Sequence, residues 1–148
     1  SETGIILSLI TLGLDVAIYY YNRYPSKLFL SDVGSLSLGA AVGLVAILGH
    51  IEVPTMIAIL PYIMNGFHSL VSIGKLFERH SLKERPTIVM EDGLIDSNPS
   101  PKAPLTLTRM ILAERPLSER EIVKEMVKLT SFSSVLGVLT AFLCQVSL

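Results

Sequence analysis

The sequence predicts an all-α membrane protein of about four transmembrane helices, with a cytoplasmic loop region that contains a short β-hairpin and an amphipathic helix. Two observations favour this fold class. Half of the 148 residues are hydrophobic and only 17% are charged, a balance unlike that of soluble domains. The apolar residues gather in long runs, and a polar stretch, residues 78–130, precedes the last of them.

The first run, residues 4–21, is long enough to span a bilayer with a slight tilt. It ends in consecutive tyrosines, which are typical of the interface between membrane and water. Asp15 interrupts the run on the same helical face as Asn22. We interpret Asp15 as a polar residue satisfied inside the helix bundle, and a place in a polar cleft shared with Asn22 stays open.

The second and third runs differ in their expected regularity. Residues 33–51 contain no charged side chain and several glycines and alanines, which predicts a closely packed span. Residues 53–77 contain two prolines, and we expect Pro54 in the first helical turn and a bend at Pro61.

Within the polar region, Asp92-Gly93 lies between two short apolar runs, which predicts a β-hairpin. Ser118 and Glu121 have the spacing of a capping box and begin an amphipathic helix over residues 119–129. We expect that helix to lie on the membrane surface or on the protein itself. Residues 132–148 are the fourth run, marginal in length for a span.

The charges predict the topology and exclude one class of function. A net charge of -1, without a basic stripe interleaved with aromatic residues, argues against nucleic acid as a partner. With four spans, all Lys and Arg residues fall on one side of the membrane, which the positive-inside rule makes cytoplasmic. The single cysteine, Cys144, cannot form a disulfide or a thiolate metal site within the chain.

The stretch with the clearest chemical character is residues 22–39, NRYPSKLFLSDVGSLSLG, which places polar residues and glycines between two apolar runs. An aspartate at the centre of a bilayer helix costs roughly 2.5 to 3.5 kcal/mol, so we expect Asp32 at a membrane boundary or in a polar cleft. Gly34 and Gly39 are expected to let a helix or a ligand approach the backbone beside it.

The pattern N-x-x-P-S-K-x-F-x-x-D-x-G-S-x-x-L-G in this stretch, followed by Arg79-His80, resembles the polyprenyl-phosphate N-acetylhexosamine-1-phosphate transferase family, glycosyltransferase family 4. The resemblance covers about the first 80 residues well and the remainder by layout. It is nearest to the branch that transfers GlcNAc-1-phosphate from UDP-GlcNAc to dolichyl phosphate, since the loop lacks the histidine run of the phospho-MurNAc-pentapeptide branch.

The resemblance implies a role for each matching residue. Asp32 matches the metal-binding aspartate of the family, and Phe29, one helical turn earlier, matches the aromatic that stacks on uracil. The polar lead-in to that motif is matched by Asn22 and Lys27. Two further catalytic residues, which engage the pyrophosphate and the sugar, are matched by Arg79 and His80.

The resemblance further implies transfer of GlcNAc-1-phosphate to a polyprenyl (dolichyl-type) phosphate with release of UMP, as the first step of lipid-linked glycan assembly. Mg²⁺ is the expected cofactor, with Mn²⁺ as an alternative. We expect three spans and the site in residues 1–77, the cytoplasmic loop in 78–130 and the last span in 131–148. The expected location is the plasma membrane of a prokaryote or the endoplasmic reticulum, with the active site on the cytoplasmic face.

The paired aspartates of the family belong to helices absent from this sequence, so the chain looks like the C-terminal half of an enzyme. We expect it to need the missing N-terminal half for activity, and a homodimer stays open. Two alternatives remain: a non-catalytic membrane module, such as a transporter fragment or an assembly subunit, and a relative of the phospho-MurNAc-pentapeptide transferases.

Overall fold

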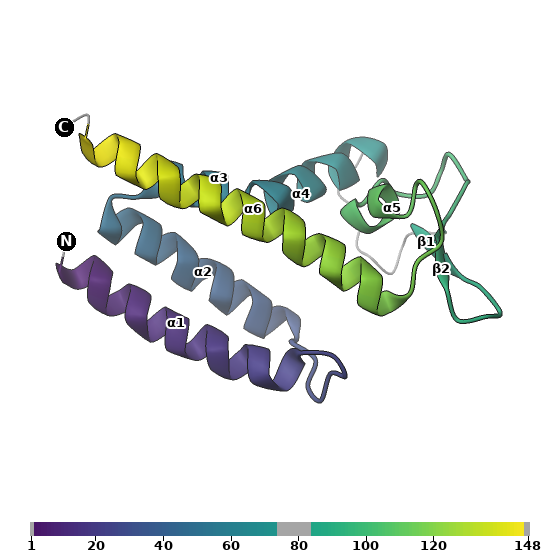
Figure 1. The fold of residues 1–148 in the computed structure, drawn as a ribbon, viewed down its shortest axis with the longest axis horizontal. Coiled ribbons are helices and arrows are strands. Elements are labelled where there is room, and N and C mark those ends of the chain that lie inside the picture. Colours follow the sequence, from purple (N-terminus) through teal and green to yellow (C-terminus); the bar gives the residue numbers. More distant parts are fainter. Residues whose placement is uncertain (1, 74–83, 147–148) are drawn as a thin grey trace. The chain divides into compact units, whose positions relative to one another are not determined.

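The computed structural model describes residues 2–73 and 84–146. Helices dominate, with one two-stranded sheet, which confirms the predicted helical class and its hairpin. In chain order the elements are α1 (Glu2–Asn22), α2 (Asp32–Gly49), α3 (Glu52–Ala58), α4 (Leu60–Ile73), β1 (Thr87–Val89), β2 (Ile95–Ser97), α5 (Leu107–Ile111) and α6 (Glu119–Val146) (Figure 1).

The chain divides into two compact units, one formed by Ser1–Met56 with Leu139–Leu148 and the other by Ile57–Val138. In the first unit, α1 and α2 lie side by side and antiparallel (Figure 1). The buried residues of the pair are small, namely Gly4, Thr11 and Ala46. Of the small residues that we expected to pack closely in the second run, Ala46 is buried, whereas Gly39 and Gly43 face open space in the described part of the chain.

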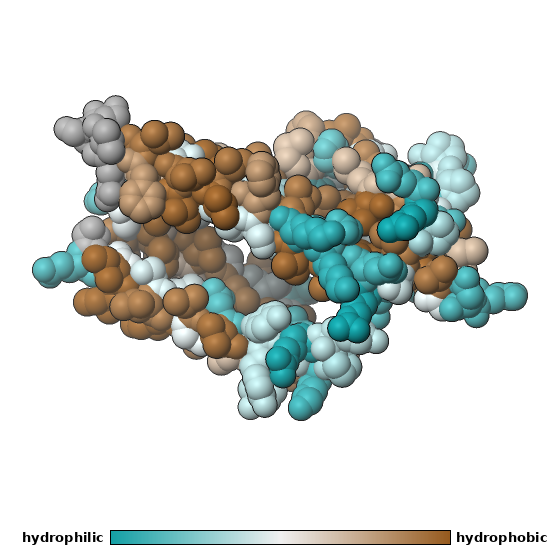
Figure 2. Space-filling model, viewed as in Figure 1, coloured by the Kyte–Doolittle hydropathy of each residue, from teal (hydrophilic) through white to brown (hydrophobic). Residues whose placement is uncertain are grey.

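Three of the described helices are long and apolar enough to cross a bilayer: α1, α2 and Glu119–Cys144 of α6. No more than 11% of any of these apolar windows is buried inside the structure. Figure 2 shows hydrophobic surface over much of these helices, with hydrophilic surface among the loops beside α5. Apolar side chains on this scale require lipid or further protein around them, so the protein is an integral membrane protein.

The third predicted span is not a single helix, and the count of four spans is therefore not confirmed. The helix breaks at Ile59, between α3 and α4, two residues before Pro61. Proline has no N–H for the carbonyl four residues earlier, Ile57 O, and its ring crowds that carbonyl. Ile57 O accepts a hydrogen bond from the Ser133 hydroxyl of α6 instead. The predicted bend at Pro61 is thus present, and Pro54 lies in the first turn of α3 as expected.

The second unit contains the hairpin and a small apolar core. Strands β1 and β2 pair antiparallel, with Ile88 opposite Asp96. Gly93 takes the turn position with a φ of +80°, which glycine adopts without a steric cost. The core consists of Leu112, Leu117 and Ile122, with Ile95, Ile111 and Met126 packed against it. This core joins the hairpin, α5 and the first turns of α6.

Helix α6 begins at the predicted capping box. The Ser118 backbone N–H and hydroxyl both donate to Glu121 Oε2, at 2.9 and 2.7 Å. The amphipathic helix and the fourth apolar run, which we expected to be separate, form one helix of 28 residues. The apolar face expected for residues 119–129 consists of Ile122, Val123, Met126, Val127 and Leu129. Ile122 and Met126 pack in the core, while Val123, Val127 and Leu129 are exposed.

Candidate functional site

The turn between α1 and α2, residues 23–31, carries most of the predicted site residues and is closed by backbone hydrogen bonds. The amide groups of Lys27 and Leu28 both donate to Tyr21 O, at 2.9 and 3.3 Å. The Ser26 hydroxyl lies 3.2 Å from Asn22 Oδ1 and 2.9 Å from Leu28 O. Asn22 therefore helps to shape the turn from the last residue of α1.

Asp32 is the first residue of α2. The preceding residue, Ser31, takes the extended N-cap conformation (φ -75°, ψ 171°) and its side chain makes no capping hydrogen bond. The Asp32 carboxylate is exposed, and no residue in the described part of the chain donates a hydrogen bond to it or pairs with it. Its negative charge is stabilised by the partial positive charge of the helix N-terminus, and its oxygens stay available to a ligand.

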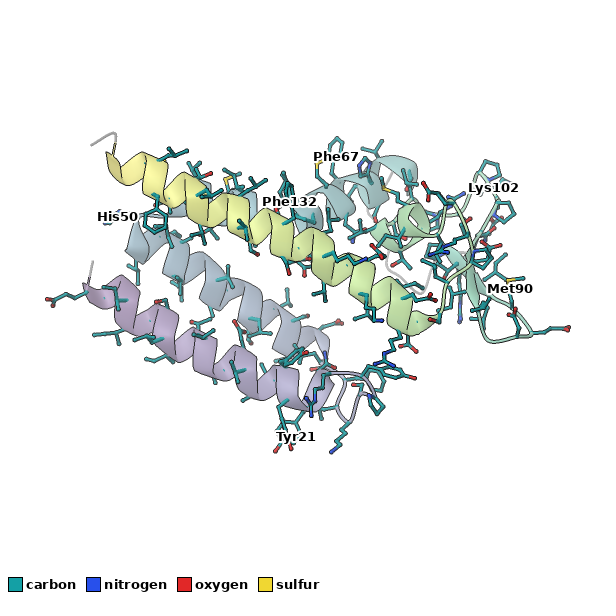
Figure 3. The ribbon with its side chains drawn as sticks, in the orientation of Figure 1. Tyr21, His50, Phe67, Met90, Lys102 and Phe132 are labelled. Atoms are coloured by element: carbon teal, nitrogen blue, oxygen red, sulfur yellow. The ribbon has the colours of Figure 1, made fainter. Side chains whose placement is uncertain are left out.

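Phe29 and Lys27 present their side chains to the outside of the same turn. Phe29 is 85% exposed, the highest value among the large apolar residues that the structure describes. Figure 3 places Tyr21 at this end of the α1–α2 pair and His50 at the opposite end. The turn thus places Asn22, Lys27, Phe29 and Asp32 at one end of the helix pair.

The two glycines after Asp32 have different surroundings. A Cβ atom on Gly34 would lie 3.1 Å from Cγ of Leu30, so the expected space beside this glycine is filled by the turn itself. Gly39 has no atom within 4 Å of a built Cβ and is open to an approaching group, as expected. Asp15 lies on the exposed surface of α1.

The fit to a divalent cation rests on Asp32. A carboxylate is a hard oxygen ligand of the kind Mg²⁺ prefers, and Mg²⁺ usually keeps several waters and takes only one or two protein carboxylates. Among residues 2–73 and 84–146, no three His, Cys, Asp or Glu side chains cluster closely enough to enclose a metal. Asp32 thus suits one position in an open magnesium shell.

The remaining predicted site residues, Arg79 and His80, lie outside the described residues. Three polar side chains on one face of α4 form hydrogen bonds with the backbone before and at the start of α5. The Leu105 N–H donates to Ser72 Oγ (2.9 Å), the Ser69 hydroxyl donates to Leu105 O (3.3 Å), and the Leu107 N–H donates to Asn65 Oδ1 (2.6 Å).

Asn98 forms two hydrogen bonds with the backbone just before β1. Asn98 Nδ2 donates to Arg85 O at 2.7 Å, and the Asn98 backbone N–H donates to Pro86 O at 3.0 Å. The sequence did not predict these contacts. Asn65, Ser69 and Ser72 are spaced by four and three residues, and this spacing could have indicated that the three polar side chains share one helical face.

Comparison with known proteins connects the turn to a family. Residues 1–50, which include the whole turn and α2, match the model of glycosyl transferase family 4. A Methanocaldococcus jannaschii protein named as a glycosyltransferase is 26% identical over 95% of this chain and 45% of its own length.

Two bacterial enzymes match shorter stretches at higher identity. The phospho-N-acetylmuramoyl-pentapeptide-transferase of Blochmanniella floridana is 40% identical over 45% of this chain and 17% of its own length. The enzyme of the same name from Buchnera aphidicola is 36% identical over 54% of this chain and 21% of its own length. The chain thus spans less than half the length of these relatives, and no solved structure matches it at a significant level. The chain is thus similar to glycosyl transferase family 4 over its first 50 residues, and to a named glycosyltransferase over most of its length.

Proposed function

We propose that this chain is part of an enzyme that transfers GlcNAc-1-phosphate from UDP-GlcNAc to a polyprenyl (dolichyl-type) phosphate in the membrane. The observation that carries the proposal is the exposed and unpartnered Asp32 carboxylate at the start of α2, in a turn with an exposed Phe29, inside the residues that match the family. A ring and a carboxylate left without partners among the described residues suit a ligand that has both a base and a pyrophosphate.

The reaction is a phosphoryl-group transfer. An oxygen of the lipid phosphate forms a bond to the sugar-bearing phosphorus, the bond between the two phosphates of the nucleotide breaks, and UMP leaves. Mg²⁺, or Mn²⁺ in its place, neutralises the pyrophosphate charge when it is bound, and Asp32 would hold one side of it. We assign Phe29 to the uracil and Asn22 and Lys27 to the polar rim of the turn.

Arg79 and His80 are assigned to the pyrophosphate and the sugar. Positive groups at these positions stabilise the charge that develops as the phosphate bond breaks. We further propose that the site faces the cytoplasm, of a prokaryote or at the endoplasmic reticulum, because nucleotide sugars are met there. We propose that a missing N-terminal half of the enzyme would supply the remaining ligands, and a homodimer is compatible with this assignment.

A second candidate has its own support. Phospho-MurNAc-pentapeptide transferases match this chain at 40% and 36% identity over its shared stretch. The full-length protein, in proteoliposomes with polyprenyl phosphate and Mg²⁺, distinguishes the candidates through release of UMP from UDP-GlcNAc or from UDP-MurNAc-pentapeptide. Turnover of UDP-GlcNAc is the expected result. Turnover of the pentapeptide donor alone would favour the second candidate, and turnover of neither would favour a non-catalytic membrane module.

A further inference from the structure

We propose that Asp15 and Gly39 mark a surface on which the α1–α2 pair binds another transmembrane helix of the same enzyme, and that this helix carries a Lys, Arg or protonated His opposite Asp15. The proposal rests on the proposed function in one respect, because that function makes this chain part of a longer enzyme. Neither residue has a role in the transfer reaction described above.

Asp15 lies inside α1, one of the helices that are long and apolar enough to cross a bilayer. It is seven residues before Asn22, the last residue of α1, and so lies about 10 Å from that end of the helix. Tyrosines are typical of the membrane interface, and Asp15 is about one to two helical turns deeper than Tyr19, Tyr20 and Tyr21. An aspartate side chain is too short to reach the interface from this depth. Contact with lipid is therefore costly for its carboxylate unless protein compensates the charge.

The described spans do not supply that compensation. Asp15 is exposed, and no hydrogen bond or ion pair joins it to any residue among 2–73 and 84–146. Helices α1 and α2 and residues 129–146 of α6 contain no Lys, Arg or His. The same spans of a second copy would bring no cation to Asp15 either. The chain spans less than half the length of its relatives, which leaves other residues of a longer enzyme to supply the helix.

Gly39 lies on α2 at the same depth. It is seven residues after Asp32, the first residue of α2, and so lies about 10 Å from the turn that joins α1 and α2, as Asp15 does. Asp15 follows the buried Thr11 by four residues and shares its helical face. Gly39 precedes the buried Ala46 by seven residues and shares its helical face. The buried faces of both helices thus end at one level, where Asp15 and Gly39 are exposed.

This surface is open to the backbone of a neighbouring helix. No atom lies within 4 Å of a Cβ built on Gly39 or on Gly43, one turn later on α2. Small residues spaced by four let two transmembrane helices approach closely. A helix seated on these glycines lies beside Asp15, at a depth within the hydrocarbon core that lipid headgroups do not reach. Its cation determines which helix binds, because any other helix leaves the Asp15 carboxylate unpaired.

Thermal unfolding of the full-length protein in detergent tests the ion pair. Asp15→Asn and Asp15→Leu should each lower the melting temperature by about 3 °C or more, since each leaves the partner cation buried without a counter-charge. Glu52→Gln is the matched control, because Glu52 is an exposed acid in the first turn of α3, outside the three apolar helices, and it should change nothing. An Asp15 that faces lipid predicts a higher melting temperature for Asp15→Leu. That result, or unchanged melting of both Asp15 variants, would overturn the proposal.

A charge-swap scan identifies the partner. In the Asp15→Lys variant of the full-length protein, each Lys, Arg and His is changed in turn to Glu. One change outside residues 1–148 should restore the melting temperature, although each of the two changes alone lowers it. Rescue only by a change within these residues, such as Lys75→Glu, or no rescue at all, would overturn the proposal. Absence of UMP release from the unaltered protein would overturn the proposed function instead, and the melting temperatures would still test the contact.

Discussion

Phe29 and Asp32 are three residues apart, yet no helix joins them: Phe29 lies in the turn, and α2 begins at Asp32 itself. The expectation that Phe29 lies one helical turn before Asp32 is therefore wrong, because Ser31 takes the extended N-cap conformation. The ring and the carboxylate are oriented independently, the ring by the turn and the carboxylate by the helix. A planar base and a charged pyrophosphate can thus be bound by neighbouring but separate elements.

Phe29→Ala should weaken binding of the nucleotide sugar by about 1 to 3 kcal/mol, the range for an aromatic ring stacked on a base. Stability should change little, because the side chain is 85% exposed. Isothermal titration of the full-length protein with UDP-GlcNAc measures the effect, and Tyr24→Ala in the same turn is the control. Equal weakening for the lipid phosphate would show that Phe29 maintains packing instead of binding the base.

Ser133→Ala should destabilise the protein by about 1 to 3 kcal/mol, because it removes the donor for the Ile57 carbonyl that Pro61 leaves without an N–H. Ser133 is buried, so water cannot readily replace the hydroxyl. Denaturant unfolding in detergent measures the loss. In the double variant with Pro61→Ala, which restores an N–H, much of the loss should be recovered. A fully additive double variant would contradict this explanation of the break at Ile59.

His50 ends α2 in the left-handed conformation, with a φ of 55°. A residue with a Cβ atom pays roughly 1 to 2 kcal/mol for this conformation, whereas glycine adopts it freely. His50→Gly should therefore preserve or raise the melting temperature, and His50→Val should lower it, since β-branched residues tolerate positive φ poorly. The opposite order of the two variants would show that the His50 side chain stabilises the helix end in another way.

Membrane topology can be checked by labelling single cysteines at Glu52 and Lys102 in a Cys144→Ser background. Both positions are exposed. The positive-inside rule places the basic loop in the cytoplasm, so a membrane-impermeant thiol reagent added outside intact cells should label the cysteine at Glu52 and not that at Lys102. Labelling of both from outside would contradict the proposed orientation.

Local signals in the sequence predicted the elements that depend on a few neighbouring residues. Asp92-Gly93 predicted the hairpin, and Ser118 with Glu121 predicted the start of α6, because turn and cap geometry involve residues close in sequence. The continuity of α6 was missed although no glycine or proline stands between residues 119 and 136 to end the helix. The length of an apolar run does not show where a surface helix ends and a membrane span begins when the two form one continuous helix.

Contacts between distant residues could not be predicted in the same way. The hydrogen bond from the Leu107 N–H to Asn65 Oδ1 and the one from the Arg109 guanidinium to Ala103 O depend on how α4, α5 and the hairpin pack together. Within the candidate site, a pattern in one short stretch of the sequence predicted the turn residues. The structure adds that these residues are exposed. Their chemical roles stay predictions.

The central claim is that Asp32 supports the transfer reaction by holding a divalent cation. The most direct measurement is magnesium-dependent release of UMP by the full-length Asp32→Asn variant, which keeps the shape of the side chain and removes its charge. Turnover should fall by at least about 100-fold, or roughly 2.7 kcal/mol in transition-state stabilisation, while Asp15→Asn should cost much less. Near-normal turnover of Asp32→Asn at ordinary magnesium concentrations would contradict the assignment of Asp32 to the cation.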